Sequence, residues 1–375
     1  MKIIHIVDSM EMGGAEMLVT QLCRWQRRDG HAPMVHCLME GGVLADQLEQ
    51  EGIPVYVCAP FSDFSGKFRL MRDLWMEFKR QRPDVVHCHN TFATVMAAPS
   101  ARWVGVGAVV TTRHGLVSPP GAFMKQNGLP GKLGNAIRFC LAAAYCDRVV
   151  AVCKKGQENL EAAPGAFLYK VSTIQNGTDP APVGLSPDPL IGKEGFTLIN
   201  VARLDWKKNH ACLLRAVAQA RRKVPDLYLW LLGDGPEREN LQRLACKLNI
   251  QSCVQFAGQR RDVGDWLAQA DLFVLSSFTE GLPVSLMEAM ASGLPFIVTD
   301  VGDMPEIARS SGAGTVVESD HPEELAEAIV QAASQREELV ETGRRARKYY
   351  EEHFTPSQMV ASYTRLYQDC IRRNM

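Results

Sequence analysis

Short apolar runs alternate with longer amphipathic stretches along most of the chain, and this alternation constrains the fold most strongly. The runs from Ile3 to Val7 and from Ala108 to Arg113 are bounded by polar residues and are typical of buried strands. Apolar residues recur at helical spacing between such runs, near residues 43–51, 67–81 and 91–103. Strands that alternate with helices predict an α/β protein with parallel, doubly wound sheets.

The length of the chain predicts two domains. With 375 residues, of which 46% are hydrophobic, it exceeds what one ordinary core accommodates. Proline and glycine crowd the interval from Pro180 to Gly192 without periodicity, which is typical of a linker. We therefore expect an N-terminal domain at 1–185, a C-terminal domain at 186–355, and a final helix at 356–375 that follows the break at Pro356.

Charge and cysteine usage exclude several classes of protein. The 41 basic and 42 acidic residues balance, which excludes nucleic-acid binding as the main activity. The 11 cysteines form no Cys-x-x-Cys pair, so we interpret them as reduced core residues of a cytoplasmic protein. Asp8 interrupts the first apolar run, and no apolar run approaches 18 residues, so we expect neither a signal peptide nor a membrane span.

A strand, a turn and a helix are predicted between Asp271 and Ser292, and this stretch carries the main candidate site. In a parallel sheet, ligands bind outside the carboxyl ends of strands, and a helix N-terminus attracts phosphate. Glu280 lies in the turn, and Glu288 lies in the helix with seven residues between them. The first carboxylate is placed to lie beside a reacting centre, and the second to accept two hydrogen bonds from a ribose diol. Chance spacing of two helical glutamates is the alternative.

Two cations follow the predicted strand at 196–202. Arg203 and Lys208 are five residues apart around a turn, which suits a diphosphate that receives a bidentate fork and a point charge. A solvated charged loop is the alternative interpretation.

Two further strand ends carry candidate residues. Gly13 and Gly14 follow the first strand and allow backbone to approach a ligand, although an ordinary turn is an equal alternative. The Gly-x-Gly-x-x-Gly spacing is absent, so we expect no nicotinamide cofactor. His87 and His89 share one face of a strand end, but no third ligand lies nearby in sequence, and we expect no metal. His114 follows the strand at 108–113.

The string from Glu280 through Glu288 to Pro295, with Gly302 and Glu306 behind it, closely resembles the nucleotide-sugar site of the GT-B glycosyltransferases of family four. Gly13-Gly-Ala-Glu16 and Arg203-x4-Lys208-Asn resemble other parts of the same family. The resemblance implies two Rossmann-like domains that face a cleft, with the C-terminal helix crossing back to the N-terminal domain. It also implies catalytic roles for Glu280 and for His114, which would lie beside the transferred sugar. The donor-binding residues it implies are Gly13, Gly14, Arg203, Lys208, Gly258, Arg260, Gly281, Leu282, Val284 and Glu288.

The implied activity is transfer of a hexose from a UDP-sugar or GDP-sugar, with retention and without metal or cofactor. The acceptor would be a glycan or a lipid-linked glycan in polysaccharide or lipopolysaccharide synthesis. A sugar-nucleotide epimerase, a phosphorylase, and a non-catalytic partner subunit on the same fold remain alternatives.

A basic helix predicted at residues 67–82 leaves two interpretations open. It holds six basic and two acidic residues beside an apolar stripe that includes Phe68, Leu74 and Trp75. In one interpretation the charges form a solvated face. In the other they form a surface that draws the protein to anionic lipid at the inner face of the membrane, together with Arg113, Lys125, Lys132 and Arg138.

Overall fold

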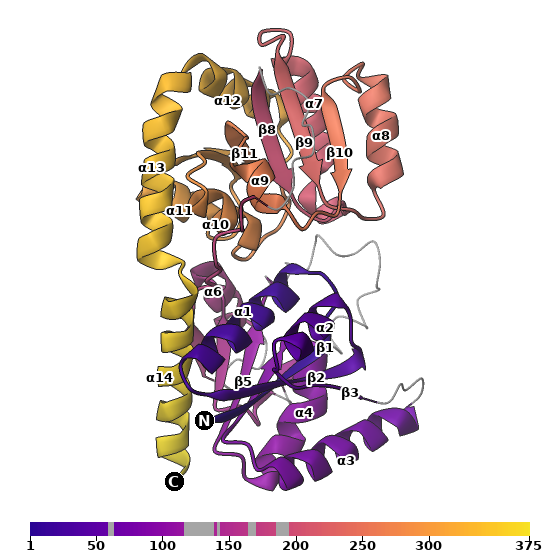
Figure 1. The fold of residues 1–375 in the computed structure, drawn as a ribbon, viewed down its shortest axis with the longest axis vertical. Coiled ribbons are helices and arrows are strands. Elements are labelled where there is room, and N and C mark those ends of the chain that lie inside the picture. The colour runs from indigo at the N-terminus through magenta and orange to yellow at the C-terminus, as the bar shows by residue number, and fades with distance from the viewer. Residues whose placement is uncertain (59–63, 116–138, 141–142, 164–169, 185–194) are drawn as a thin grey trace. The chain divides into compact units, whose positions relative to one another are not determined.

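The computed structural model describes residues 1–58, 64–115, 139–140, 143–163, 170–184 and 195–375. The chain divides into two compact units, one formed by residues 1–177 with 356–375 and the other by residues 178–355. Each unit contains one sheet with helices around it (Figure 1). Two doubly wound α/β domains are therefore confirmed. Lys125, Lys132 and Arg138 lie outside the described residues.

The first unit is built on a seven-stranded sheet in the order β3-β2-β1-β4-β5-β6-β7, and its strand pairs are parallel. Its strands are β1 Lys2–Ser9, β2 Ala32–Glu40, β3 Val55–Val57, β4 Val85–His89, β5 Ala108–Arg113, β6 Arg148–Ala151 and β7 Val171–Thr173. Its helices are α1 Gly14–Arg28, α2 Val43–Gln50, α3 Phe64–Gln81, α4 Asn90–Val104, α6 Lys154–Glu161 and α14 Pro356–Asn374.

Side chains that alternate along the strands give this sheet two cores. Ile4 and Ile6 of β1 pack in one core with α3 and α4. Val7 of the same strand packs in the other with α1 and α2. Because successive strand residues point to opposite faces, His5 lies on the face that α1 covers. This face carries the polar cluster described below.

The C-terminal helix α14 belongs to the first unit, as predicted, and contacts α1 and β5 (Figure 1). Tyr363 and Tyr367 are buried on it. The Tyr363 hydroxyl lies 2.9 Å from Oγ1 of Thr112 on β5, and the Tyr367 hydroxyl lies 2.7 Å from Nδ1 of His87 on β4. The crossover helix thus completes the core over the centre of the first sheet.

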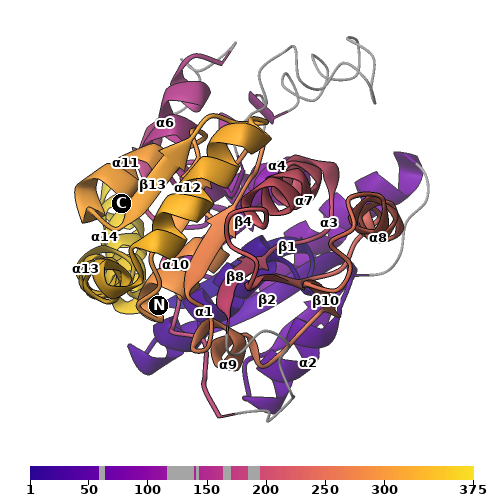
Figure 2. The ribbon, with the colours of Figure 1, turned by 90° about the horizontal axis from the view of Figure 1, so that it is seen from above.

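The second unit holds a six-stranded parallel sheet in the order β10-β9-β8-β11-β12-β13, with α7 and α12 packed against each other beside it (Figure 2). Its strands are β8 Phe196–Val201, β9 Leu227–Leu232, β10 Val254–Gly258, β11 Leu272–Leu275, β12 Phe296–Thr299 and β13 Gly314–Val317. After the short 3-10 helix η2, Trp206–Lys208, its helices are α7 His210–Ala220, α8 Arg238–Lys247, α9 Val263–Leu267, α10 Val284–Ala291, α11 Met304–Ser311, α12 Pro322–Ser334 and α13 Arg336–His353.

Residues 178–184, which the sequence assigned to the N-terminal domain, pack in the second unit. The Tyr350 hydroxyl donates to the carbonyl of Thr178 at 2.6 Å, and the amide of Gly184 donates to the Asp265 carboxylate. A Cβ on Gly264 would lie 2.1 Å from the carbonyl oxygen of Pro182, so the backbones meet closely there. Among the helices described, none combines the length and apolar character needed to cross a membrane.

Candidate functional site

The turns after β8 and β11 form one charged group in the second unit. Nζ of Lys208 lies 2.5 Å from Oε1 of Glu280, and the Ser277 hydroxyl donates to the same oxygen at 2.7 Å. The side chains are 22% exposed for Lys208 and 9% exposed for Glu280, so the pair is largely removed from solvent. The structure thus brings together two residues that the sequence placed in separate roles.

Backbone contacts hold these two turns side by side. The Asp205 carboxylate accepts a hydrogen bond from the amide of Lys207 at 2.9 Å and caps η2. The amide of Phe278 donates to the carbonyl of Lys207 at 2.7 Å, and the Ser276 hydroxyl lies 3.1 Å from the carbonyl of Lys208. Because both turns are fixed at the backbone, they keep Lys208 within reach of Glu280, and the hydrogen bond to Glu280 then sets the position of the ammonium.

Arg203 stands on the same turn with an exposed side chain, and it makes no ion pair with a described residue. The loop that carries Arg203 packs closely against the turn after β9. A Cβ on Gly233, whose φ is +134°, would lie 2.0 Å from the carbonyl oxygen of Ala202, and a Cβ on Gly235 would lie 2.4 Å from that of Leu204. Glycine is required at this contact. The guanidinium remains available to an anion.

Helix α10 starts next to the ion pair, with Pro283 as its N-cap residue and Val284 as its first residue. Gly281 and Leu282, just before it, are buried. No side chain caps this end, so first-turn amides are donors without an intrahelical acceptor, as an anion site requires. Glu288 lies one turn into the helix, and withdrawal of its carboxyl from water raises its pKa to about 7.

The loop after β12 supports the same turn. A Cβ on Gly302, whose φ is +62°, would lie 2.4 Å from the carbonyl oxygen of Glu280. The Thr299 hydroxyl donates to the carbonyl of Ser277 at 2.7 Å. The loop after β12 therefore fixes the backbone that carries Glu280.

The turn after β10, which carries the expected donor-binding residues Gly258 and Arg260, adjoins the turn after β9. The amide of Gly233 donates to the carbonyl of Gly258 at 2.7 Å. The Arg260 guanidinium makes two hydrogen bonds to the Asp262 carboxylate, at 2.7 and 2.6 Å, and lies over the ring of Trp266. Those hydrogen bonds hold the pKa of Asp262 below its usual value. The charge of Arg260 is thus already paired with Asp262.

In the first unit, Gly13 and Gly14 begin α1 at the end of β1. Gly13 is extended, and a Cβ there would meet only the carboxylate of Glu16, the end of a flexible side chain. Asp8 lies nearby, and burial together with the charge of Glu16 raises the pKa of its carboxyl to about 6. The side chains of Asp8 and Glu16 line a small pocket with His89 and Asn90, and Gly13 and Gly14 are not among its lining residues. Neither carboxylate was predicted as a site residue from the sequence, although Asp8 directly follows an apolar strand.

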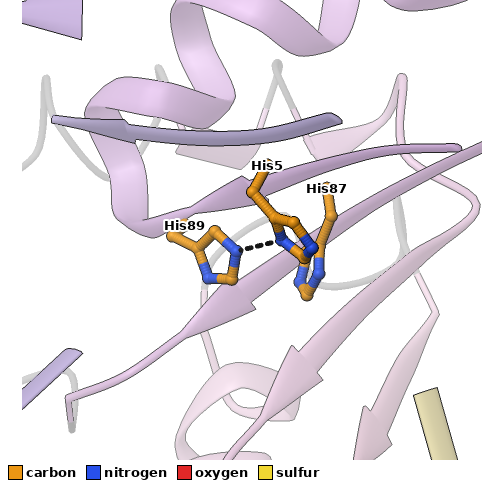
Figure 3. Close-up of side chains that lie close together, drawn as sticks. All are labelled: His5, His87 and His89. Atoms are coloured by element: carbon orange, nitrogen blue, oxygen red, sulfur yellow. Dashed lines mark hydrogen bonds between the residues drawn. The ribbon is translucent and has the colours of Figure 1, made fainter. Parts of the chain in front are cut away.

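His114 ends a row of hydrogen-bonded side chains in the first unit. Its Nε2 lies 2.9 Å from Nδ1 of His89, whose Nε2 lies 3.0 Å from Nδ1 of His5 (Figure 3). Nε2 of His5 lies 2.8 Å from Oε1 of Gln26 on α1. Burial lowers the pKa of His5 and of His114 to about 4 and that of His89 well below its ordinary value, so all three rings are neutral near pH 7.

His5, His87 and His89 stand within metal-ligating distance of one another, with nitrogen atoms within 4.8 Å (Figure 3). The sequence offered only His87 and His89, because His5 comes from β1, which pairs with β4 in a register that sets His5 beside His87. All six ring nitrogens already have hydrogen-bond partners. Those of His87 are the Thr112 and Tyr367 hydroxyls at 2.7 Å each. The donor set therefore fits a hydrogen-bonded cluster better than a metal centre.

Two family models match the chain in succession. The model described as Glycosyltransferase Family 4 matches residues 12–182, and that described as Glycosyl transferases group 1 matches residues 185–349. A putative glycosyltransferase of Bacillus subtilis, EpsF, is 30% identical over 325 residues, which cover 80% of this chain and 79% of that protein.

A further relative and two solved structures are also similar to this chain. The UDP-Gal:alpha-D-GlcNAc-diphosphoundecaprenol alpha-1,3-galactosyltransferase of Escherichia coli is 25% identical over 79% of both chains. The crystal structure of HepE from Anabaena in complex with UDP-glucose superposes with a TM-score of 0.83 at 20% identity, covering 98% of this chain and all of that one. WaaG, a glycosyltransferase involved in lipopolysaccharide biosynthesis, superposes with a TM-score of 0.71 at 16% identity, covering 96% and 98%.

Proposed function

This chain belongs to the GT-B glycosyltransferases whose two family models it matches, and we propose that it transfers a hexose from a nucleotide-diphosphate sugar with retention and without a metal ion. The observation that carries the proposal is the charged group after β8 and β11, where Lys208 and Glu280 pair beside the N-terminus of α10. Cations and amides that meet at carboxyl ends of parallel strands suit a diphosphate leaving group.

In this proposal each residue of the second unit has one task. Arg203 and Lys208 neutralise the diphosphate as its bond to the sugar breaks, with help from the amides of Gly281, Leu282 and Val284. Glu288 accepts the ribose hydroxyls. Gly258 and Arg260 hold the base. These contacts are stronger for the departing diphosphate than for the intact donor, because negative charge grows there in the transition state.

Glu280 directs Lys208 and contacts the transferred sugar in this proposal. Its carboxylate already accepts hydrogen bonds from Lys208 and Ser277. An oxygen engaged in this way is a poor nucleophile, so we assign Glu280 to positioning the sugar. In the first unit, Gly13 and Gly14 approach the donor, and His114 contacts a hydroxyl of the sugar.

The relatives support a glycan or lipid-linked acceptor. The E. coli relative is named for a diphosphoundecaprenol-linked sugar, and a human relative, 27% identical over 79% of this chain and 61% of that protein, is named as a phosphatidylinositol N-acetylglucosaminyltransferase subunit. We place the reaction in cell-surface polysaccharide or lipopolysaccharide synthesis, on the cytoplasmic side of the membrane. Helix α3 supports peripheral attachment, since Phe68 and Met76 are 60% and 46% exposed among its basic residues.

A donor panel tests the proposal. Thermal shift with UDP-sugars and GDP-sugars identifies the donor, because a ligand at about a hundred times its dissociation constant adds roughly 2.7 kcal/mol. The purified protein is then incubated with that donor and a lipid-linked glycan, with and without a chelator. We expect an α-linked product from an α-linked donor in both. An acceptor-independent change of the sugar would instead show an epimerase, dependence on inorganic phosphate would show a phosphorylase, and absence of donor binding would show a non-catalytic subunit.

A further inference from the structure

We propose that the buried row Gln26–His5–His89–His114 is a directional hydrogen-bond relay that fixes the tautomer of His114, so that Nδ1 of His114 is a hydrogen-bond acceptor for a hydroxyl of the transferred sugar. The row joins α1 to the middle of β1, the end of β4 and the residue that follows β5. It rests on the proposed function only in naming the sugar hydroxyl, since the direction of the relay is a property of the protein alone.

The direction starts at Gln26. The structure sets the amide oxygen of Gln26 2.8 Å from Nε2 of His5, with the Gln26 amide nitrogen unpartnered among the described residues, and in this orientation Nε2 of His5 carries the proton. A neutral imidazole has one N–H, so Nδ1 of His5 accepts, and Nε2 of His89 donates to it across 3.0 Å. By the same step, Nδ1 of His89 accepts from Nε2 of His114 across 2.9 Å. Each ring thereby dictates the tautomer of the next.

The relay ends at an acceptor. With its proton on Nε2, His114 keeps a lone pair on Nδ1, and this buried atom has no hydrogen-bond partner among the described residues. An unpaired buried acceptor is costly unless a ligand supplies a donor. The amide of His114 donates to the Asn90 side chain at 3.3 Å, which fixes the backbone as well. The ring is therefore held in both orientation and tautomer before substrate arrives.

The relay requires that the three histidine rings are neutral, and their burial keeps them so. The cluster is buried, and no carboxylate of a described residue is hydrogen-bonded to these rings, although Asp8 and Glu16 line the same small pocket as His89. Burial lowers the pKa of His5 and His114 to about 4. The Tyr367 and Thr112 hydroxyls are the hydrogen-bond partners of His87. This fourth ring is tilted against His89, with the ring centroids 4.2 Å apart, and does not join the row (Figure 3). His87 and its partners therefore supply a control of the same chemistry outside the relay.

Nitrogen NMR of the full-length protein labelled with 15N-histidine tests the direction. Two-bond proton–nitrogen correlations distinguish the two neutral tautomers, and His114 is assigned from a His114→Gln sample. At pH 7 we expect His5, His89 and His114 all in the Nε2–H form. Protonation of His114 at Nδ1, or exchange between its tautomers, would overturn the relay, as would one equivalent of tightly bound zinc in the purified protein.

Variants at Gln26 test the coupling. Gln26→Leu removes the acceptor, and the two directions of the row then each leave one buried N–H unpaired, so we expect mixed tautomers at His114. Turnover of the donor selected by the panel should fall about twofold or more, while UDP binding stays unchanged. Gln26→Glu keeps an acceptor oxygen and should restore both the tautomer and the turnover.

Thr112→Val is the matched control, because it deletes a buried hydrogen bond of similar length to a histidine of the same cluster, together with the contact to the Tyr363 hydroxyl, and leaves the row itself intact. It should lower stability as Gln26→Leu does and leave the His114 tautomer unchanged. Equal effects of both variants on the tautomer would overturn the relay. If the wild-type protein consumes no donor in the panel, the proposed function fails, and the NMR result alone decides the relay.

Discussion

Replacing Glu288 by glutamine should stabilise the protein at alkaline pH while it weakens nucleotide binding. The carboxyl lies in a site where loss of water raises its pKa from 4.5 to about 7. Since a tenfold change in an acid dissociation constant corresponds to about 1.36 kcal/mol, the ionised group costs the folded state about 3 kcal/mol. Glutamine has the same shape and no charge, and it escapes this cost. In the proposed function, Glu288 is kept despite this cost because its carboxylate binds the ribose.

The direction in which stability changes with pH follows from proton binding to Glu288. Between pH 4.5 and 7 the folded protein holds a proton on Glu288 that the unfolded chain has lost, so stability falls as pH rises through this window. The contribution of the neutral carboxyl is complete below pH 4.5 and lost above about 7. The stabilising effect of Glu288→Gln should therefore be small near pH 4.5, grow with pH, and level off at about 3 kcal/mol.

Thermal unfolding at pH 5 and pH 8.5 measures the effect. For a unit of this size, about 3 kcal/mol corresponds to roughly 6 to 12 °C at the higher pH. Titration with UDP at pH 8.5 should show weaker binding by the same variant. Glu327→Gln, on the exposed face of α12 in the same unit, is the control and should change neither quantity. A stability difference that does not depend on pH, or a loss of stability at pH 8.5, would refute the reasoning.

Three other predictions concern the charged groups. Arg203→Ala and Lys208→Ala should each weaken UDP binding by about 1.5 to 3 kcal/mol, roughly 10- to 150-fold, without changing the circular dichroism; unchanged affinity in both would contradict the diphosphate assignment. Glu280→Gln should lower turnover with little change in UDP affinity, and equal changes in both would mean that its role is misassigned. Co-sedimentation should show salt-sensitive binding of the protein to anionic but not to neutral vesicles. Binding should be lost when alanine replaces Lys79, Arg80 and Arg82, and kept when alanine replaces the control residues Arg344, Arg347 and Lys348 of α13. If the wild-type protein binds neither kind of vesicle, the basic residues of α3 form a solvated face only.

The sheets were predictable because their signals are local. A buried parallel strand needs an apolar run, and the residues that follow it must lie at the carboxyl edge of the sheet. This reasoning placed Arg203, Lys208 and Glu280 at strand ends from the sequence alone. Helix α3 was predicted in position but less well in burial, since Leu74 is buried whereas Phe68 is 60% exposed. Periodicity shows that a helix has an apolar stripe, and packing decides how much of the stripe the sheet covers.

Side-chain contacts across the sheet were not predictable, because they depend on strand order and register. His5 pairs with His87 only because β1 lies next to β4, although 82 residues separate them. The residues near His5 in sequence carry no trace of this contact. The sequence did predict that His87 and His89 share one face of a strand end, but a histidine within a strand has no assigned partner on another strand until the fold is known.

The pairing of Lys208 with Glu280 illustrates the same limit and also shows how the two roles depend on each other. Strand order sets β8 beside β11, so turns 72 residues apart in sequence share one ion pair at 2.5 Å. An ammonium that is already held by a carboxylate has little rotamer freedom to lose when a diphosphate arrives, which lowers the entropic cost of binding. In the proposed function, the carboxylate in turn keeps a fixed position beside the atom whose bond is to break. The proposed diphosphate contact and sugar contact would then form one preorganised unit, which rests on the backbone that Gly302 allows to approach.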